Sequence, residues 1–281
     1  GQIITIAGNG SRGFSGDRGP AIDAQLSGPA EIAVDGEGDI IFADSYNHVI
    51  RRIERGGQIV TIAGDGTAGF SGDGGLAISA RLNIPIGVAV DGEDNIIFAD
   101  SHNHVIRRID RDGRIATIAG NNKKGFSGDK GRATEAQLNT PAGVTVDGDN
   151  NIIFTEVEGN RIRRISPEKI ITTIAGTGAK GFDGDYGPAI DAQLAAPMAV
   201  AVDSRGNYIV TDVVNHRVRR ISAQGIIATI AGNGEKIFEG DGGLAIVARL
   251  HIPLGVAVDN RGGTIVTDFA SNRIVRFGVT D

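Results

Sequence analysis

The chain has 281 residues, a formal net charge of −6 and no cysteine. The acidic balance lacks the basic surface that nucleic acids and anionic membranes attract, so we expect neither as a partner. Without cysteine the chain can form no disulfide and no thiolate site, so the cysteine count leaves its compartment open. We slightly favour an extracellular or periplasmic location. No apolar run reaches the length that spans a bilayer, and residue 1 opens directly on a strand pattern, so the sequence predicts a soluble domain without a targeting signal.

The chain is built from one repeated unit. The tetrad Thr5-Ile6-Ala7-Gly8 returns at residues 61–64 and then three more times, each copy 56 residues after the last. A fixed period of this length is typical of a propeller, a solenoid or an array. We therefore predict one domain over residues 1–281. Its five units are residues 1–56, 57–112, 113–168, 169–224 and 225–281.

The elements of the first unit can be taken in order. Residues 2–7 are a β-branched run that predicts a strand. A loop of about twenty residues follows, and residues 20–26 within it predict one or two helical turns with Ile22 and Leu26 on one face. Three more strands are predicted at 31–34, 40–43 and 48–53, with turns between them.

Four strands per unit predict an all-β fold, a β-propeller of five four-stranded blades with short helical turns in the long loops between blades. Both chain ends fall on the same position of the repeat. We therefore predict that the last blade takes three strands from residues 255–279 and its fourth from residues 2–8, which closes the ring and removes its open edges. The protein is then expected to be a monomer. The alternative is a larger ring cut at a repeat boundary.

One signature within each unit resembles a known family. Residues 87–109 read Gly-Val-Ala-Val-Asp-Gly-x-x-Asn-Ile-Ile-Phe-Ala-Asp-Ser-x-Asn-His-x-Ile-Arg-Arg-Ile, and this pattern resembles the NHL repeat in all five units. The resemblance implies a β-propeller, most often of six blades, that is used largely for interactions and occasionally as a lyase scaffold. This chain differs in having five copies and a long Gly-Phe-Ser-Gly-Asp insertion, and no position of it matches the metal and histidine site of the family's lyases.

Two loop motifs invite a ligand-binding interpretation. The glycine-rich residues 13–17 could cradle a phosphate, but they lack the lysine of a nucleotide loop, so we predict that Phe14 pins the loop and Asp17 caps a turn. Asp35-x-Glu37-x-Asp39 has the spacing of calcium ligands but lacks the later bidentate glutamate, so we predict a plain hairpin turn.

Charged residues recur at fixed places. Arginine pairs stand at 51/52, 107/108, 163/164 and 219/220, and repeated acids stand at Asp44, Asp100, Glu156, Asp212 and Asp268. Adjacent strand residues point to opposite faces, so we predict structural ion pairs rather than a basic surface. His48, His104 and His216 share one position with Asn160 and Asn272. Because asparagine is a poor metal ligand, this position predicts turn stabilisation.

Positions that differ between the units are free to form a unique site. Tyr46, His102, Glu158, Val214 and Ala270 share one such position; Ser27, Asn83, Asn139, Ala195 and His251 share another. Glu31 replaces a small residue and places a lone acid near the predicted axis, and Met198 replaces a smaller or branched residue. The ligand-binding candidates are Glu31, Tyr46, His102, Glu158, Met198 and His251. The alternative is drift at a tolerant rim.

We therefore predict a non-catalytic binding or scaffold module whose loop face holds a protein, a peptide or a small ligand, with no catalytic residue, metal or cofactor. One alternative is a lyase or lactonase with a metal on the axis near Glu31, His102 and His251. A multivalent sugar binder ranks third because three tyrosines and no tryptophan leave few stacking surfaces. The close similarity of the copies also fits a recently amplified or designed repeat protein.

Overall fold

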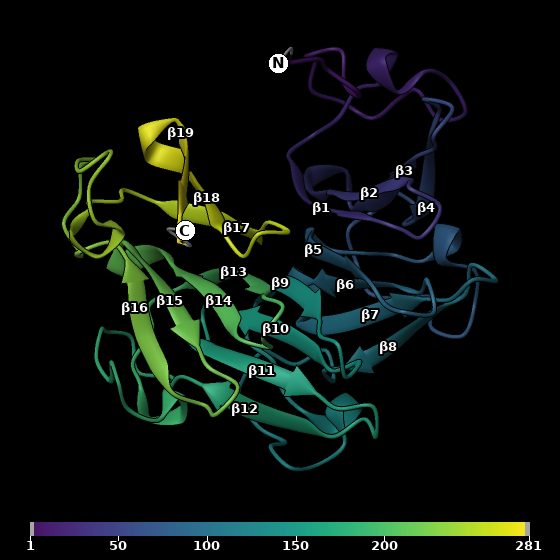
Figure 1. Cartoon of the computed structure of the whole chain (residues 1–281). Helices are drawn as coiled ribbons and strands as arrows, with labels where there is room; N and C mark the ends of the chain where they lie inside the picture. The colour runs from purple at the N-terminus through teal and green to yellow at the C-terminus, as the bar shows by residue number, and fades with distance from the viewer. Residues whose placement is uncertain (1–2, 279–281) are drawn as a thin grey trace. The chain divides into compact units, whose positions relative to one another are not determined.

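The computed structural model describes residues 3–278. They fall into two compact units, each larger than one 56-residue repeat: the described residues up to 124 and those from 125 on. The prediction of one domain over the whole chain stays a prediction. In both units the chain folds into antiparallel sheets whose strands follow one another in sequence order (Figure 1).

The first unit holds two four-stranded sheets. Their strands are β1 (Pro29–Val34), β2 (Ile40–Asp44), β3 (Val49–Ile53) and β4 (Ile59–Ala63), then β5 (Pro85–Val90), β6 (Ile96–Asp100), β7 (Val105–Ile109) and β8 (Ile115–Ala119). The two sheets pack through β1 and β5, and Val88 lies in a core with Ile41 and Ile50 of the first sheet.

The second unit holds two four-stranded sheets and one of three strands among the described residues. Their strands are β9 (Pro141–Val146), β10 (Ile152–Glu156), β11 (Arg161–Ile165) and β12 (Ile171–Ala175); β13 (Pro197–Val202), β14 (Tyr208–Asp212), β15 (Arg217–Ile221) and β16 (Ile227–Ala231); β17 (Pro253–Val258), β18 (Thr264–Asp268) and β19 (Arg273–Phe277). Successive sheets again pack through their first strands. The five sheets are the blades of a five-bladed β-propeller, as predicted.

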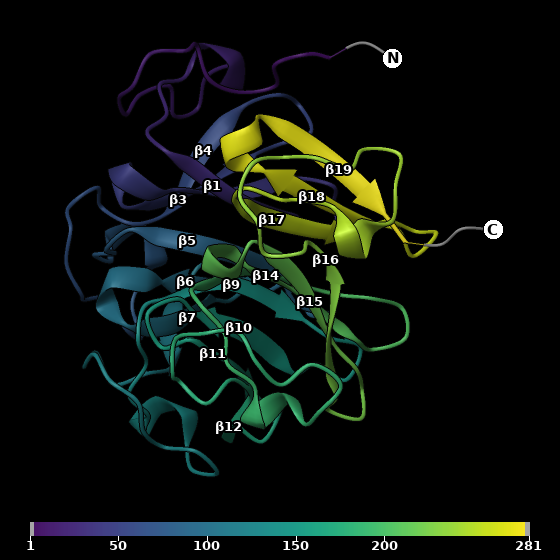
Figure 2. The same cartoon turned by 90° about the vertical axis from the view of Figure 1, so that its left-hand side faces the viewer.

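The predicted fourth strand of the last blade differs from the structure. Residues 3–7 lie outside any strand, and the Ile3 side chain is 100% exposed. Gln2 lies outside the described residues. A strand is defined by its cross-strand hydrogen bonds, and residues 3–7 have no strand partner among the described residues of their own unit. Residues 3–6 are exposed, whereas Ala7 packs against the core that contains Ala21 and Ile59. The sheet of β17–β19, which Figure 2 labels, has three strands among the described residues, so the prediction that residues 2–8 supply its fourth strand is not met.

All described helices are three-residue 3₁₀ turns, and none is long and apolar enough to cross a membrane. Those in the long loops are η1 (Ala21–Asp23), η3 (Ala77–Ser79), η5 (Ala133–Glu135), η6 (Ala189–Asp191) and η8 (Ala245–Val247). Those between the second and third strands of a blade are η2 (Ser45–Asn47), η4 (Ser101–Asn103), η7 (Val213–Asn215) and η9 (Phe269–Ser271).

The predicted short helical turns are confirmed, but the face assigned to them is wrong. Ala24, which follows η1, is already extended, so the four-residue spacing of Ile22 and Leu26 no longer places them together. Ile22 is exposed, whereas Leu26 packs against a core that contains Ala21 and Ile59.

Candidate functional site

The largest buried polar groups are arginines of the third strand in the first four repeats. Arg51, Arg107, Arg163 and Arg219 are fully buried. Side chains alternate along a strand, so each of these arginines faces the long loop while its neighbour, such as Arg220, faces away. This alternation confirms that the arginine pairs split between two environments.

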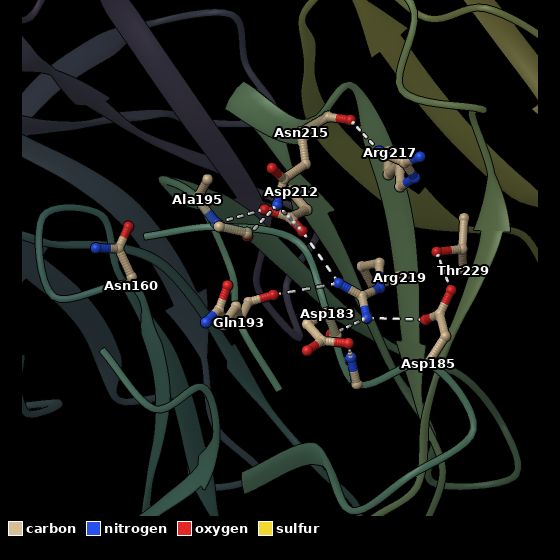
Figure 3. Close-up of polar contacts among 12 residues, drawn as sticks. Asn160, Asp183, Asp185, Gln193, Ala195, Asp212, Asn215, Arg217, Arg219 and Thr229 are labelled. Carbon is tan, nitrogen blue, oxygen red and sulfur yellow. Dashed lines mark hydrogen bonds and ion pairs between the residues drawn. The ribbon is translucent and has the colours of Figure 1, made fainter. Parts of the chain in front are cut away.

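Arg219 shows how such a guanidinium is held (Figure 3). It lies 3.3 Å from Asp212 and 2.8 Å from Asp185. It also donates to the backbone carbonyl oxygens of Gln193 and Asp183. The other three arginines pair in the same way with the acid on the second strand, at 3.7 Å for Arg51–Asp44, 3.6 Å for Arg107–Asp100 and 3.4 Å for Arg163–Glu156. The predicted structural ion pairs are confirmed in these four repeats.

The glycine-rich loop closes over this arginine. The guanidinium carbon of Arg51 lies 5.2 Å from the centroid of the Phe14 ring, and the ring stays half-exposed. The prediction that Asp17 caps a turn is not met among the contacts of the described residues. It accepts a hydrogen bond from Arg51 at 2.7 Å and another from the Thr61 hydroxyl. The acid of the glycine-rich loop therefore pairs with the arginine of its own repeat. This contact supports a structural role for the loop rather than a phosphate-binding one.

Burial sets the protonation of the paired acids. Desolvation raises the pKa of Asp100 to about 7, although the Asn103 amide, the Asn83 backbone N–H and Arg107 all favour the charged form. Desolvation likewise raises the pKa of Glu156 to about 7 against the charge of Arg163. Both raised pKa values belong to acids that pair with buried arginines inside a blade, so we assign them a structural role.

The shared histidine and asparagine position joins neighbouring sheets. His48 has a left-handed backbone with φ of 57°, and its Nδ1 accepts a hydrogen bond of 3.1 Å from the Ile84 N–H of the next repeat. In the third repeat Asn160 Oδ1 accepts from the Ala196 N–H at 3.0 Å. Both residue types supply one acceptor and tolerate a left-handed backbone, which explains why they alternate. The predicted turn role is thus extended to a link between sheets.

The motif with the spacing of calcium ligands, Asp35-x-Glu37-x-Asp39, forms a turn. Asp35 Oδ1 accepts the backbone N–H groups of Glu37 and Asp39, so the predicted hairpin turn is confirmed. In neither unit do the described residues include a group of three or more His, Cys, Asp or Glu side chains arranged to hold a metal ion.

The variable positions lie at the tips of the blades. Tyr46 in η2 and His102 in η4 are exposed, and Arg12 lies 5.3 Å from the Tyr46 ring centroid. The backbone N–H of Tyr46 donates to the Ser27 carbonyl, and that of His102 donates to the Asn83 carbonyl. The same bond joins Val214 to Ala195 in the second unit. The two variable positions are therefore neighbours in the first, second and fourth repeats.

The remaining candidates are more scattered. Glu158 is exposed in the turn after β10, Glu31 is half-buried in β1, and Met198 is half-buried in β13, where its carbonyl accepts from the Thr155 hydroxyl. The His251 ring lies 6.2 Å from that of His216, whose Nδ1 contacts the His251 carbonyl oxygen. The structure thus brings Tyr46 close to Arg12 and His251 close to His216, and it places Glu31 and Met198 within blades.

A cleft that we did not predict lies beside β14. Its volume is about 790 Å³, and Asp147, Arg164, Arg205 and Tyr208 are among its lining residues. The Tyr208 hydroxyl donates to Asp147 at 2.8 Å, and burial raises the pKa of Tyr208. Tyr208 stands where the earlier repeats have Ile40, Ile96 and Ile152. Comparing the repeats at this position could therefore have identified Tyr208 as a candidate from the sequence.

Comparisons with known proteins agree with this architecture. A family model described as the teneurin NHL domain matches residues 66–127. Teneurin-1 of Mus musculus is 31% identical over 232 residues, which are 74% of this chain and 8% of teneurin-1. Teneurin-m of Drosophila melanogaster is 27% identical over 275 residues, which are 85% of this chain and 10% of teneurin-m. The chain thus spans a small part of the relatives that it matches.

Solved structures share the fold at lower identity. Virginiamycin B lyase from Staphylococcus aureus is 18% identical with a TM-score of 0.56, covering 91% of this chain and 71% of the lyase chain. A chain of a nidogen–laminin complex is 16% identical with a TM-score of 0.60, covering 90% of this chain and 76% of its own length. From its repeated signature, its five blades and these matches, the chain belongs to the NHL-repeat β-propeller family.

Proposed function

We propose that this chain is a non-catalytic recognition module that holds a protein or peptide partner on the blade tips. One observation carries the proposal. The first four repeats agree in their buried arginine and acid and in the phenylalanine beside them. They differ at one exposed position and at a less exposed position that the fold makes its neighbour, as at Tyr46 with Ser27 and His102 with Asn83. A surface that varies over a constant interior is what a selective binding face requires.

Tyr46 is the residue we expect to contribute most. Tyr46 is 57% exposed. Its ring lies beside the Arg12 guanidinium and so close to Gly28 that a Cβ at residue 28 would clash with it. An exposed aromatic ring held in one orientation loses little entropy on binding, and tyrosine and arginine are enriched among the residues that dominate interfaces. His102 and the neighbouring loops of the same unit would then set selectivity.

The proposal can be tested with a random peptide library displayed on phage. We expect the purified chain to enrich a family of related peptides, and Y46A and H102A each to weaken their binding at least tenfold. Tyr186 is an exposed tyrosine in a long loop, so Y186A is the matched control and should bind as the unchanged chain does. Enriched peptides that bind all variants equally, or no enrichment at all, would contradict the proposal.

A further inference from the structure

The fifth repeat keeps the frame of the arginine cluster but not its arginine. Position 275 is valine where the first four repeats have Arg51, Arg107, Arg163 and Arg219. The groups that hold the arginine elsewhere remain in place: Phe238 corresponds to Phe182, Asp241 to Asp185 and Asp268 to Asp212.

The backbone around this site follows that of the fourth repeat. Glu239 and Arg249 pair through backbone hydrogen bonds as Asp183 and Gln193 do, and Arg219 donates to the carbonyls of that second pair. A carbonyl oxygen has two lone pairs, so the Glu239 and Arg249 carbonyls can accept a guanidinium as well. Their side chains are paired with one another at 2.8 Å.

The two acids lack a guanidinium from this strand. Asp268 is fully buried, and its carboxylate accepts the backbone N–H groups of His251 and Ile252. Asp241 is exposed and has no ion pair among the described residues. Asp268 lies two residues after Val266, which pairs with Val275 in the sheet, so the Asp268 carboxylate and the Val275 side chain share a face of the blade.

The phenylalanine ring of the fifth repeat contacts one guanidinium, whereas that of the fourth repeat contacts two. In the fourth repeat the Phe182 ring contacts two guanidinium carbons, Arg217 at 3.6 Å and Arg219 at 4.8 Å. In the fifth repeat the Phe238 ring contacts Arg273 at 4.2 Å, and this is its only cation contact among the described residues. Arg217 and Arg219 show that the charge of Arg273 is compatible with a second guanidinium beside the ring.

A cavity opens at this place. It has a volume of about 70 Å³ and is lined by Phe238, Asp241, Ala245, Ala248, Leu250 and Val275, among others. Val275 lacks the guanidinium that an arginine would place here, and its side chain lines the cavity. The cavity therefore combines a carboxylate, an aromatic ring and small residues in the frame that accommodates a guanidinium in the other repeats. Arg276 also lines it, and its guanidinium is paired with Asp259 at 2.8 Å.

We propose that the fifth repeat binds the guanidinium group of an arginine side chain supplied by a polypeptide partner. That arginine would take the role that each of the first four repeats fills with its own residue, pairing with Asp241 beside Phe238. The proposal uses none of the blade-tip residues on which the proposed function rests, so either can fail without the other.

The test uses two-dimensional NMR of the backbone amides with the tripeptide acetyl-Gly-Arg-Gly-amide as the probe. We expect saturable shifts at Gly240, Asp241 and Gly242, at least tenfold weaker binding of the matched lysine tripeptide, and weaker binding to D241N. Free L-arginine should bind less tightly than the tripeptide; the reverse order would overturn the assignment to a polypeptide partner. Absent shifts, or equal shifts with the lysine tripeptide, would overturn guanidinium recognition.

A pair of variants on β19 keeps the test independent of the probe. V275R restores the arginine of the other repeats, so we expect it to raise the thermal unfolding midpoint by several degrees and to abolish the shifts. Ile274 is 73% exposed and points to the opposite face of the same strand, so I274R adds the same charge and should change neither quantity. V275R that gains no stability and still binds the tripeptide would contradict the proposal.

Discussion

At the scale of single residues, the adjacent arginines of one strand do different work. Arg219 is fully buried between Asp212 and Asp185, whereas Arg220 is exposed. Removing one partner of a buried ion pair leaves an uncompensated charge, so we expect R219A to lower the free energy of unfolding by about 3–5 kcal/mol. R220A should change it by about 0.5 kcal/mol or less. Urea unfolding measures both, and equal losses would contradict this division of roles.

The raised pKa of Asp100 predicts a pH dependence of stability. Because its folded pKa of about 7 lies above the ordinary pKa of 3.8 for an aspartate, the folded state binds more protons between these values, and stability falls as pH rises through this window. His48 and His216 have lowered pKa values and act in the opposite sense near pH 6, so the wild-type profile alone is mixed.

D100N separates these contributions. The asparagine does not titrate, so the stability advantage of the wild-type chain over D100N should shrink by up to about 3 kcal/mol between pH 5 and pH 8. The histidines contribute equally to both proteins and cancel in the difference. Urea unfolding across this range measures it. An advantage that grows with pH would show that Arg107 outweighs desolvation and that Asp100 is ionised throughout.

At the scale of elements, the link between neighbouring sheets depends on one acceptor atom. His48 Nδ1 accepts the Ile84 N–H, and Asn160 Oδ1 does the same for Ala196. We therefore expect H48N to keep the stability of the chain within about 0.5 kcal/mol, since asparagine accepts this bond and tolerates a left-handed backbone.

H48A is the informative partner of that variant. It removes the acceptor and places alanine at a positive φ, so we expect a loss of about 1–3 kcal/mol. Thermal unfolding of H48N and H48A side by side measures the difference. If H48N were as unstable as H48A, the imidazole ring itself, rather than its acceptor atom, would be the stabilising group.

The sequence predicted the elements better than the contacts between them. Strand alternation was enough to place Arg51 and Arg52 on opposite faces, and the paired acid Asp44 follows from the repeat. The contact of Arg51 with Asp17 spans 34 residues and depends on how the glycine-rich loop folds back, which no local pattern encodes. The prediction that Ile22 and Leu26 share one face was wrong for a related reason. The 3₁₀ turn ends after three residues, so the helical spacing on which the prediction rested does not apply.

At the scale of the whole molecule, a propeller blade gains its stability from the sheet packed on it. Val88 of β5 is 4% exposed against the first sheet, whereas Ile32 at the corresponding position of β1 is 65% exposed. We therefore expect V88S to cost about 2–4 kcal/mol of unfolding free energy, because it removes buried methyl groups and buries a hydroxyl.

I32S should cost about 1 kcal/mol or less, since an exposed side chain loses little by becoming polar. Val200 is 6% exposed in β13, so V200S is a second buried reference and should resemble V88S. Chemical unfolding of the three variants at several protein concentrations measures the contrast. If I32S proved as costly as V88S at every concentration, the outer face of β1 would be covered within one chain in solution; a cost that grew with concentration would mean that a second copy covers it.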